Sequence, residues 1–185
     1  MSRAPEQKTN SRGIPEAKFI ENVPEFLNVQ GKSPDAVLKE MHNTYGKYKF
    51  MEANLVQSKK NLLQKIPDII SASEAVKFLI SKKEKKEKVK THFELADSVF
   101  VKATVKKDSS SVMLWLGANV MLEYSYSEAL ELLASNLKNA QTNLATVEKD
   151  LSYLKDQITT SEVNIARVHN YNVQLRQDAK KKDKT

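Results

Sequence analysis

The sequence predicts a mainly α-helical chain with a small β insert, in which two long helices form an antiparallel coiled coil and are joined by two β-hairpins. Two long stretches repeat apolar residues at alternating steps of three and four, the spacing of coiled-coil helices. Between them lies a stretch in which apolar residues alternate with polar ones, which is typical of strands. Only 4 of the 185 residues are Gly and 5 are Pro, which argues against a loop-rich sandwich.

The first 32 residues show no helical or strand periodicity and hold three of the five prolines. We therefore expect residues 1–32 to form a flexible N-terminal arm, extended or disordered. Within it, GIPEAKFIENVPEFL alternates apolar and polar residues too densely for a simple linker, so this stretch is a candidate docking peptide. The first residues, MSRAPEQKTNSRG, lack the apolar core of a signal peptide, and we expect a protein of the cytoplasm or nucleus.

A first coiled-coil helix is predicted over 33–90. Ser33 can cap its free N–H groups, Pro34 suits the first helical position, and Asp35 complements the positive helix end. Steps of three and four from Leu38 to Ile80 meet apolar residues at ten of thirteen positions. Pro67 lies inside this stretch and is expected to kink the helix or interrupt its hydrogen bonds.

A second coiled-coil helix is predicted over 127–180, with Ser127 as its cap, followed by a short basic tail at 181–185. The same stepping from Leu130 to Leu175 meets apolar residues at twelve of fourteen positions, without an intervening Pro or Gly. The two periodic stretches have equal lengths, and each would form a rod of about 80 Å. Equal lengths let the chain fold back on itself, with both chain ends at one tip.

The segment between the helices, 91–126, is predicted to form two β-hairpins. Its candidate strands are about 92–96, 98–105, 111–116 and 120–125, and Gly117, Ala118 and Asn119 supply a hairpin turn. A two-stranded hairpin is only marginally stable alone, and exposed apolar strands recruit other chains. We therefore interpret this segment as an oligomerisation module. The alternative is a small cap packed on the helix ends.

Catalytic and cofactor chemistry has no support in the residues, and we expect no enzymatic activity and no cofactor. The chain has no Cys, and its three histidines show no metal-binding spacing. The GKS at Gly31–Ser33 lacks the preceding glycine of a phosphate-binding loop. No apolar run is long enough to span a membrane. The net charge of +7 comes from two short runs, 82–90 and 176–185, rather than from a basic face, which disfavours nucleic acid as a partner.

Polar residues interrupt the apolar repeat of the first helix, at Glu52, Lys59 and Ser73. One interpretation is that they fix the register of the coiled coil. The other is that the helix pair is frayed at its open tip, where Met and Tyr side chains can meet a foreign apolar chain.

Several stretches of the sequence resemble the α-type subunits of the prefoldin family. They are RGIPEAKFIENV, KYKFME, IPDI, WLGANVMLEY and TTSEVNIARVHNYNVQ. WLGANVMLEY is the most specific of them, and together they span nearly the whole chain.

The resemblance implies a chaperone subunit in a heterohexamer with one further α-type and four β-type subunits, joined through the hairpins. It also implies ATP-independent capture of unfolded actin and tubulin at the coiled-coil tips and delivery to the cytosolic group II chaperonin. The apolar strand residues expected to join subunits are Leu95, Val99, Val101, Val112, Leu114, Trp115, Leu116, Val120 and Leu122. The residues expected to bind clients at the tip are Leu38, Met41, Tyr45, Tyr48, Ile165, Val168, Tyr171 and Leu175. The alternative function is that of a structural coiled-coil adaptor that links protein partners.

Overall fold

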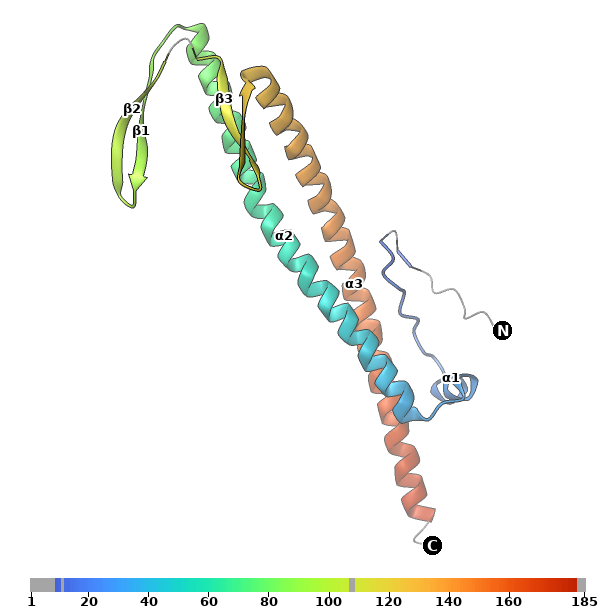
Figure 1. The fold of residues 1–185 in the computed structure, drawn as a ribbon. Helices are drawn as coiled ribbons and strands as arrows, with labels where there is room; N and C mark the ends of the chain where they lie inside the picture. The colour runs from blue at the N-terminus through green and yellow to red at the C-terminus, as the bar shows by residue number, and fades with distance from the viewer. Residues whose placement is uncertain (1–8, 11, 107–108, 183–185) are drawn as a thin grey trace. The chain divides into compact units, whose positions relative to one another are not determined.

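The structure is a computed structural model that describes residues 9–10, 12–106 and 109–182. Its elements in chain order are α1 (Val23–Gln30), α2 (Pro34–Glu84), β1 (Val89–Ala96), β2 (Val99–Val105), β3 (Ser111–Gly117), β4 (Val120–Ser125) and α3 (Tyr126–Lys182), all visible in Figure 1. Two long helices separated by two hairpins confirm the predicted fold class. Residues 1–8 of the predicted arm and 183–185 of the predicted basic tail lie outside the described residues.

The chain divides into two compact units, each of which contains part of both long helices. The arm unit comprises the described residues up to Lys59 together with those from Thr146 onward, and the hairpin unit comprises residues 60–145. In the arm unit, Tyr48 of α2 packs with Leu154 and Ile158 of α3. In the hairpin unit, Val76 of α2 packs with Ala129 and Leu133 of α3. Within the arm unit, Leu38 of α2 lies with Val168 of α3 and Tyr48 with Leu154, so the two helices run antiparallel there.

The predicted apolar repeat forms the contact between the helices. All thirteen predicted positions on α2 are buried or half-buried, including the polar residues Glu52, Lys59 and Ser73. Of the fourteen predicted positions on α3, only Leu175 is exposed. Lys59 forms an ion pair with Glu148 of α3, with 2.8 Å between its Nζ and the carboxylate.

The N-termini of the long helices are capped by serines. The Ser33 hydroxyl accepts a hydrogen bond from the Ala36 N–H, at 3.4 Å, as predicted. The second helix is capped by Ser125 and not by the predicted Ser127. The Ser125 hydroxyl accepts from the Glu128 N–H and the Glu128 carboxylate accepts from the Ser125 N–H, at 3.3 and 3.0 Å. Only Ser125 has an acidic residue three positions later, so only Ser125 can form this reciprocal pair.

The first long helix ends at Glu84, earlier than the predicted residue 90. Lys86 takes a positive φ of 54°, and its N–H donates to the carbonyl of Lys83, which ends the helical path. The following residues, from Val89, enter β1. Pro67 lies within α2, which continues through it as a single helix.

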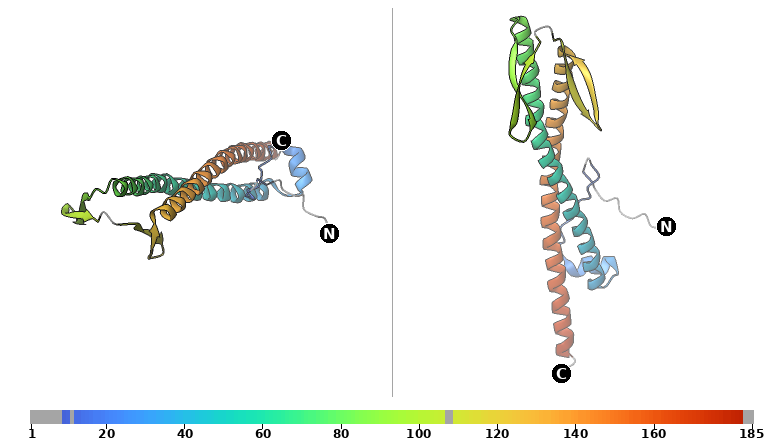
Figure 2. Two further views of the ribbon diagram at one scale, coloured as in Figure 1. Left: turned by 90° about the horizontal axis from the view of Figure 1, so that it is seen from above. Right: turned by 60° about the vertical axis from the view of Figure 1, so that its left-hand side comes forward.

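The four strands form two separate antiparallel hairpins, β1 with β2 and β3 with β4 (Figure 2). In the second hairpin, Ala118 and Asn119 take φ values of 49° and 63°. Two successive positive φ values are those of the turn that suits the twist of a hairpin, which confirms the turn predicted here. The first hairpin turns at Asp97 and Ser98, with Ser98 at a φ of 65°.

The described part of the arm is ordered against the helices, which differs from the expected flexible segment. An Asx turn opens it, in which the Asn10 side chain accepts from the N–H groups of Arg12 and Ile14. The short helix α1 follows, capped by Asn22 at its start and by Gly31 at a φ of 62° at its end. None of the described helices combines the length and the apolar character needed to cross a bilayer.

Candidate functional site

The first hairpin carries one mainly apolar face and one mainly polar face, on which Phe100 also lies opposite Glu94. Directly opposite pairs such as Phe93 with Val101 share a face, and His92 with Lys102 lie on the other. Phe93 and Val101 are exposed, at 60% and 44% of their surface. An apolar strand face that the described chain leaves uncovered is suited to contact with another chain.

The second hairpin also has two different faces, because its inner face packs on its own helices. Val112, Leu114 and Tyr124 contact the hydrophobic cluster around Tyr126 and Ala129. On the opposite face the directly paired residues are Trp115 and Met121, which are 61% and 46% exposed. The expectation of a cap packed on the helices therefore holds for one face, and the expectation of an uncovered apolar surface holds for the other.

The nine predicted assembly residues consequently separate into two groups. Val112 and Leu114 are half-buried within the chain itself. The other seven are exposed: Leu95, Val99, Val101, Trp115, Leu116, Val120 and Leu122. Sequence reasoning missed four further exposed apolar residues on the same strands: Phe93, Phe100, Met113 and Met121. Their positions within the predicted strands could have revealed them.

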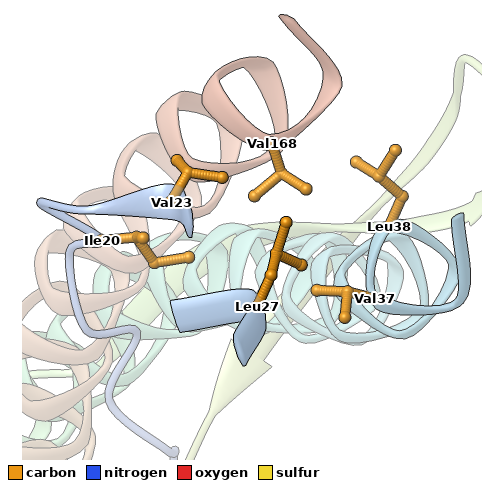
Figure 3. Packing of buried hydrophobic residues seen from close by; sticks show 6 residues of the cluster. All are labelled: Ile20, Val23, Leu27, Val37, Leu38 and Val168. Carbon is orange, nitrogen blue, oxygen red and sulfur yellow. The ribbon is translucent and has the colours of Figure 1, made fainter. Parts of the chain in front are cut away.

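The predicted tip residues lie mostly under the arm. Three apolar arm residues, Ile20, Val23 and Leu27, form a buried cluster with Val37 and Leu38 of α2 and Val168 of α3 (Figure 3). Three half-buried tip residues pack against the same cluster: Met41, Ile165 and Tyr171.

A second cluster lies further along the same helices. Ile14 of the arm is buried there with Tyr48, Leu154 and Ile158, and Tyr45 packs against this group. The Tyr48 hydroxyl donates a hydrogen bond of 2.9 Å to the carbonyl of Pro15. Burial raises the pKa of Tyr48, and the neighbouring Tyr153 adds to the shift, so the hydroxyl remains a protonated donor at neutral pH.

Of the eight predicted tip residues, Leu38, Tyr48 and Val168 are thus buried, Leu175 is exposed and the rest are half-buried. The open tip expected from the sequence differs from the structure because the chain's own arm covers it. The arm residues that face the helices recur every third position, at Ile14, Ala17, Ile20 and Val23. The sequence had instead indicated that apolar and polar residues alternate one by one along the arm.

Polar side chains on α3 hold the arm, two of them through its backbone and one through its side chains. Asp150, Gln157 and Asn164, spaced seven residues apart, are all buried. Gln157 accepts from the Ala17 N–H at 2.8 Å. Asn164 accepts from the Ile20 N–H at 2.9 Å and donates to the Lys18 carbonyl at 2.8 Å. We call Gln157 and Asn164, which bind the arm backbone, the polar ladder.

The ends of the described arm make further contacts with α3. The Asp150 carboxylate accepts from the Asn10 side chain at 3.2 Å and pairs with Arg12, also at 3.2 Å. Arg167 donates to the Glu21 carbonyl at 2.8 Å, and its guanidinium lies over the Phe19 ring, 5.2 Å from the centroid. The polar ladder is hard to recognise from the sequence, because its residues lie beside the apolar repeat, where solvated side chains are expected.

A groove of about 710 Å³ runs between the arm and α2. Phe19 and Phe26 of the arm line it together with Met41 and Tyr48 of α2. A smaller hollow of about 410 Å³ is lined by His42 and His169. Both histidines are exposed, and the described residues contain no group of side chains suited to a metal ion.

The beginning of α2 is tied to the end of α3 through Asp35. Its carboxylate accepts from the Asn172 amide at 2.9 Å and from the Arg176 guanidinium at 2.8 and 2.9 Å. The hydrogen bond from Asn172, followed by that from Arg176, lowers the pKa of Asp35. Asn172, a polar residue within the apolar repeat, therefore has a structural role.

Comparison with known proteins places this architecture in a family. A family profile described as "Prefoldin: Prefoldin subunit" matches residues 48–171, which is more than half of the chain. The chain belongs to the prefoldin family. The predicted family resemblance is therefore confirmed, and the chain is a prefoldin chaperone subunit.

Relatives from several eukaryotes match most of the chain. Prefoldin subunit 3 of Mus musculus is 48% identical over 165 residues, which are 89% of this chain and 84% of that protein. Prefoldin subunit 3 of Homo sapiens is 48% identical over 165 residues, which are 89% of this chain and 83% of that protein. That of Drosophila melanogaster is 42% identical over 182 residues, which are 98% of this chain and 92% of that protein.

A solved structure shares the fold. A chain of filamentous PFD from Methanocaldococcus jannaschii, determined by cryo-EM, superposes with a TM-score of 0.50 at 20% sequence identity. The match covers 65% of this chain and 94% of that one. The prefoldin profile begins at residue 48, so the arm and the first turns of α2 lie outside the stretch that it matches.

Proposed function

We propose that this chain is the subunit-3 type component of a heterohexameric, ATP-independent prefoldin. In this assembly it joins one further α-type and four β-type subunits through its hairpins. The complex captures unfolded or nascent proteins, chiefly actin and tubulin, and delivers them to the cytosolic group II chaperonin in the cytoplasm.

The observation that carries this proposal is the pair of hairpins with uncovered apolar faces, in a chain 48% identical to prefoldin subunit 3. The exposed residues include Phe93, Trp115 and Met121. Such side chains are costly to leave in water, at about 25 cal/mol per Å² of apolar surface. Strands of other subunits would cover them.

Reconstitution with the partner subunits tests the proposal. The native mass of the purified complex should correspond to six subunits, and the complex should suppress aggregation of denatured actin without ATP. Transfer of bound actin to the purified chaperonin should follow. An intact hexamer that fails to suppress aggregation would overturn the chaperone part of the proposal.

The adaptor alternative makes a different prediction for the isolated chain. An adaptor would form a stable homodimer and would ignore unfolded proteins. Sedimentation of the chain alone, and then with the partner subunits, separates the two functions, because a prefoldin subunit should form a defined complex only with its partners.

A further inference from the structure

We propose that the polar ladder of α3, together with Tyr48 of α2, is a binding site for the extended backbone of another polypeptide, and that residues 14–20 of the arm occupy it as a tethered competitor. The partner is a segment of an unfolded client with an apolar residue at every third position. This inference rests on the proposed chaperone function and deepens it, because it assigns the place and the chemistry of one client contact.

The hydrogen bonds of the ladder recognise backbone rather than side chains. Gln157 and Asn164 bind two N–H groups and one carbonyl of the arm, and Tyr48 binds the carbonyl of Pro15. Every residue except proline presents the same N–H and carbonyl groups. A site that binds these groups therefore accepts many sequences, which is what a chaperone of diverse unfolded chains requires.

The spacing of the ladder matches the repeat of an extended chain. From Gln157 to Asn164 the helix advances seven residues, or about 10.5 Å. The bonded arm residues advance from Ala17 to Ile20, three residues, or about 10 Å in an extended chain. The two spacings therefore match over this interval, in which the arm runs in the same direction as α3.

The buried positions for apolar side chains beside the ladder follow the same three-residue spacing. Ile14 and Ile20 are buried at 6% and 8% exposure, each in a separate cluster between α2 and α3. Glu16 and Lys18, which lie between them, are exposed. The site thus selects for an apolar side chain every third residue and is indifferent to the residues between, a loose requirement that unfolded proteins meet often.

The arm is suited to being displaced because it is an addition to the helix pair. It lies outside the stretch matched by the prefoldin profile, and between Glu16 and Ile20 it forms no regular secondary structure. It also covers predicted tip residues, including Tyr48 and Val168. A tethered segment competes at a high effective concentration, so the arm lowers the apparent affinity for clients without abolishing it.

The test uses the full chain reconstituted with its partner subunits. The client probe is fluorescein-labelled α-lactalbumin that is kept unfolded by reduction and carboxymethylation. In the arm-released variant, Ile14→Asp with Ile20→Asp, a buried carboxylate would be costly, so the arm leaves the site. A second arm-released variant lacks residues 1–21 and keeps α1 and both long helices, in case the first does not fold.

Both arm-released variants should bind the unfolded probe about tenfold more tightly than the unmodified complex, as expected when the site is open about one-tenth of the time. Gln157→Ala with Asn164→Ala, added to an arm-released variant, should remove this gain by weakening the probe about tenfold. Asn139→Ala, an exposed asparagine of α3 away from the arm, is the matched control and should change nothing. A gain that persists without the ladder would overturn the proposal, because exposed apolar surface alone would then explain it.

A synthetic peptide of residues 13–22 gives an independent measurement. It should bind the arm-released complex, compete with the unfolded probe, and bind at least tenfold more weakly when its two isoleucines are replaced by aspartate. If the peptide bound but no complex bound the unfolded probe, the proposed chaperone function would be wrong, and so would the proposal that clients bind at this site. The conclusion that the arm binds there would remain. Client binding that neither arm release nor the peptide affects would overturn the site while the chaperone function stands.

Discussion

The hairpin unit leaves most of its apolar strand residues uncovered, whereas the arm unit covers apolar residues of its helices with a segment of its own chain. Trp115 of the hairpin unit is 61% exposed, while Val168 of the arm unit is 0% exposed. The second hairpin packs one face on its own helices, and the described chain leaves the other face uncovered. The groove between two helices needs only a narrow segment, which the arm supplies. Exposure in one chain thus separates the strand surface that we propose joins other subunits from the helix surface that the chain's own arm covers.

The largest expected effect is on assembly through the second hairpin. Trp115→Lys with Met121→Lys places two charges directly opposite each other on the uncovered face, where another subunit would have to bury them. We expect loss of the hexamer with retained helix content, because Val112 and Leu114 still pack on the helices. Native mass and circular dichroism measure the two effects.

A matched pair of substitutions controls for added charge. Val56→Lys with Leu63→Lys changes two exposed apolar residues of α2, and the hexamer should persist. If this control also dissociated the complex, or if the hairpin variant assembled normally, the uncovered strand face would not be the subunit interface.

A smaller effect is expected from weakening the packing of the arm against α2 and α3. Leu27→Ala empties a buried position in the cluster formed with Val37 and Val168, and such truncations cost about 2–5 kcal/mol. Amide hydrogen exchange should become faster at Ile20 and Val23, while β3 and β4 keep their protection. Equal acceleration in the hairpins would show that the arm stabilises the whole chain rather than its own unit.

Overpacking the helix contact of the hairpin unit should cost somewhat less. Ala129 has no exposed surface between the helices, so Ala129→Leu should destabilise the chain by about 1–3 kcal/mol. Ala134→Leu, at an exposed position of the same helix, is the control. Chemical denaturation measures both, and an equal cost for the two variants would contradict the close helix contact at Ala129.

The smallest effect concerns the pH dependence of Asp35. Its lowered pKa, caused by Asn172 and then Arg176, means that the folded state favours the charged carboxylate. The contribution is present at neutral pH and is lost as the pH falls below the ordinary aspartate pKa of about 3.9. Asp35→Asn should therefore lower thermal stability slightly at pH 7 and leave it unchanged at strongly acidic pH. An equal difference at both pH values would rule out the charged contact as its cause.

Much of the fold could be predicted because its patterns are local. Steps of three and four placed the helix contact correctly, from Leu38 to Ile80 on α2. The turn at Ala118 and Asn119 followed from the residues that flank it. The N-cap of α3 was predicted at Ser127, two residues too late. The cap is Ser125, because this serine lies three positions before Glu128 and forms the reciprocal hydrogen bonds with it.

The candidate sites were less predictable. Leu114 and Leu116 lie on one strand with the same apolar character, yet Leu114 packs on the helices and Leu116 is exposed. The partners of the polar ladder lie 140 to 146 residues away in the sequence. No local pattern encodes a contact across that separation.

The sequence by itself determined two antiparallel helices, the hairpins between them and membership of the prefoldin family, because periodicity and family motifs are written in neighbouring residues. Only the tertiary structure decided which apolar residues are covered. Burial depends on what lies opposite a side chain, and here the arm lies opposite the tip residues while no described segment lies opposite Trp115. Apolar side chains of the same kind are therefore covered at the tip of the arm unit and uncovered on the strands of the hairpin unit.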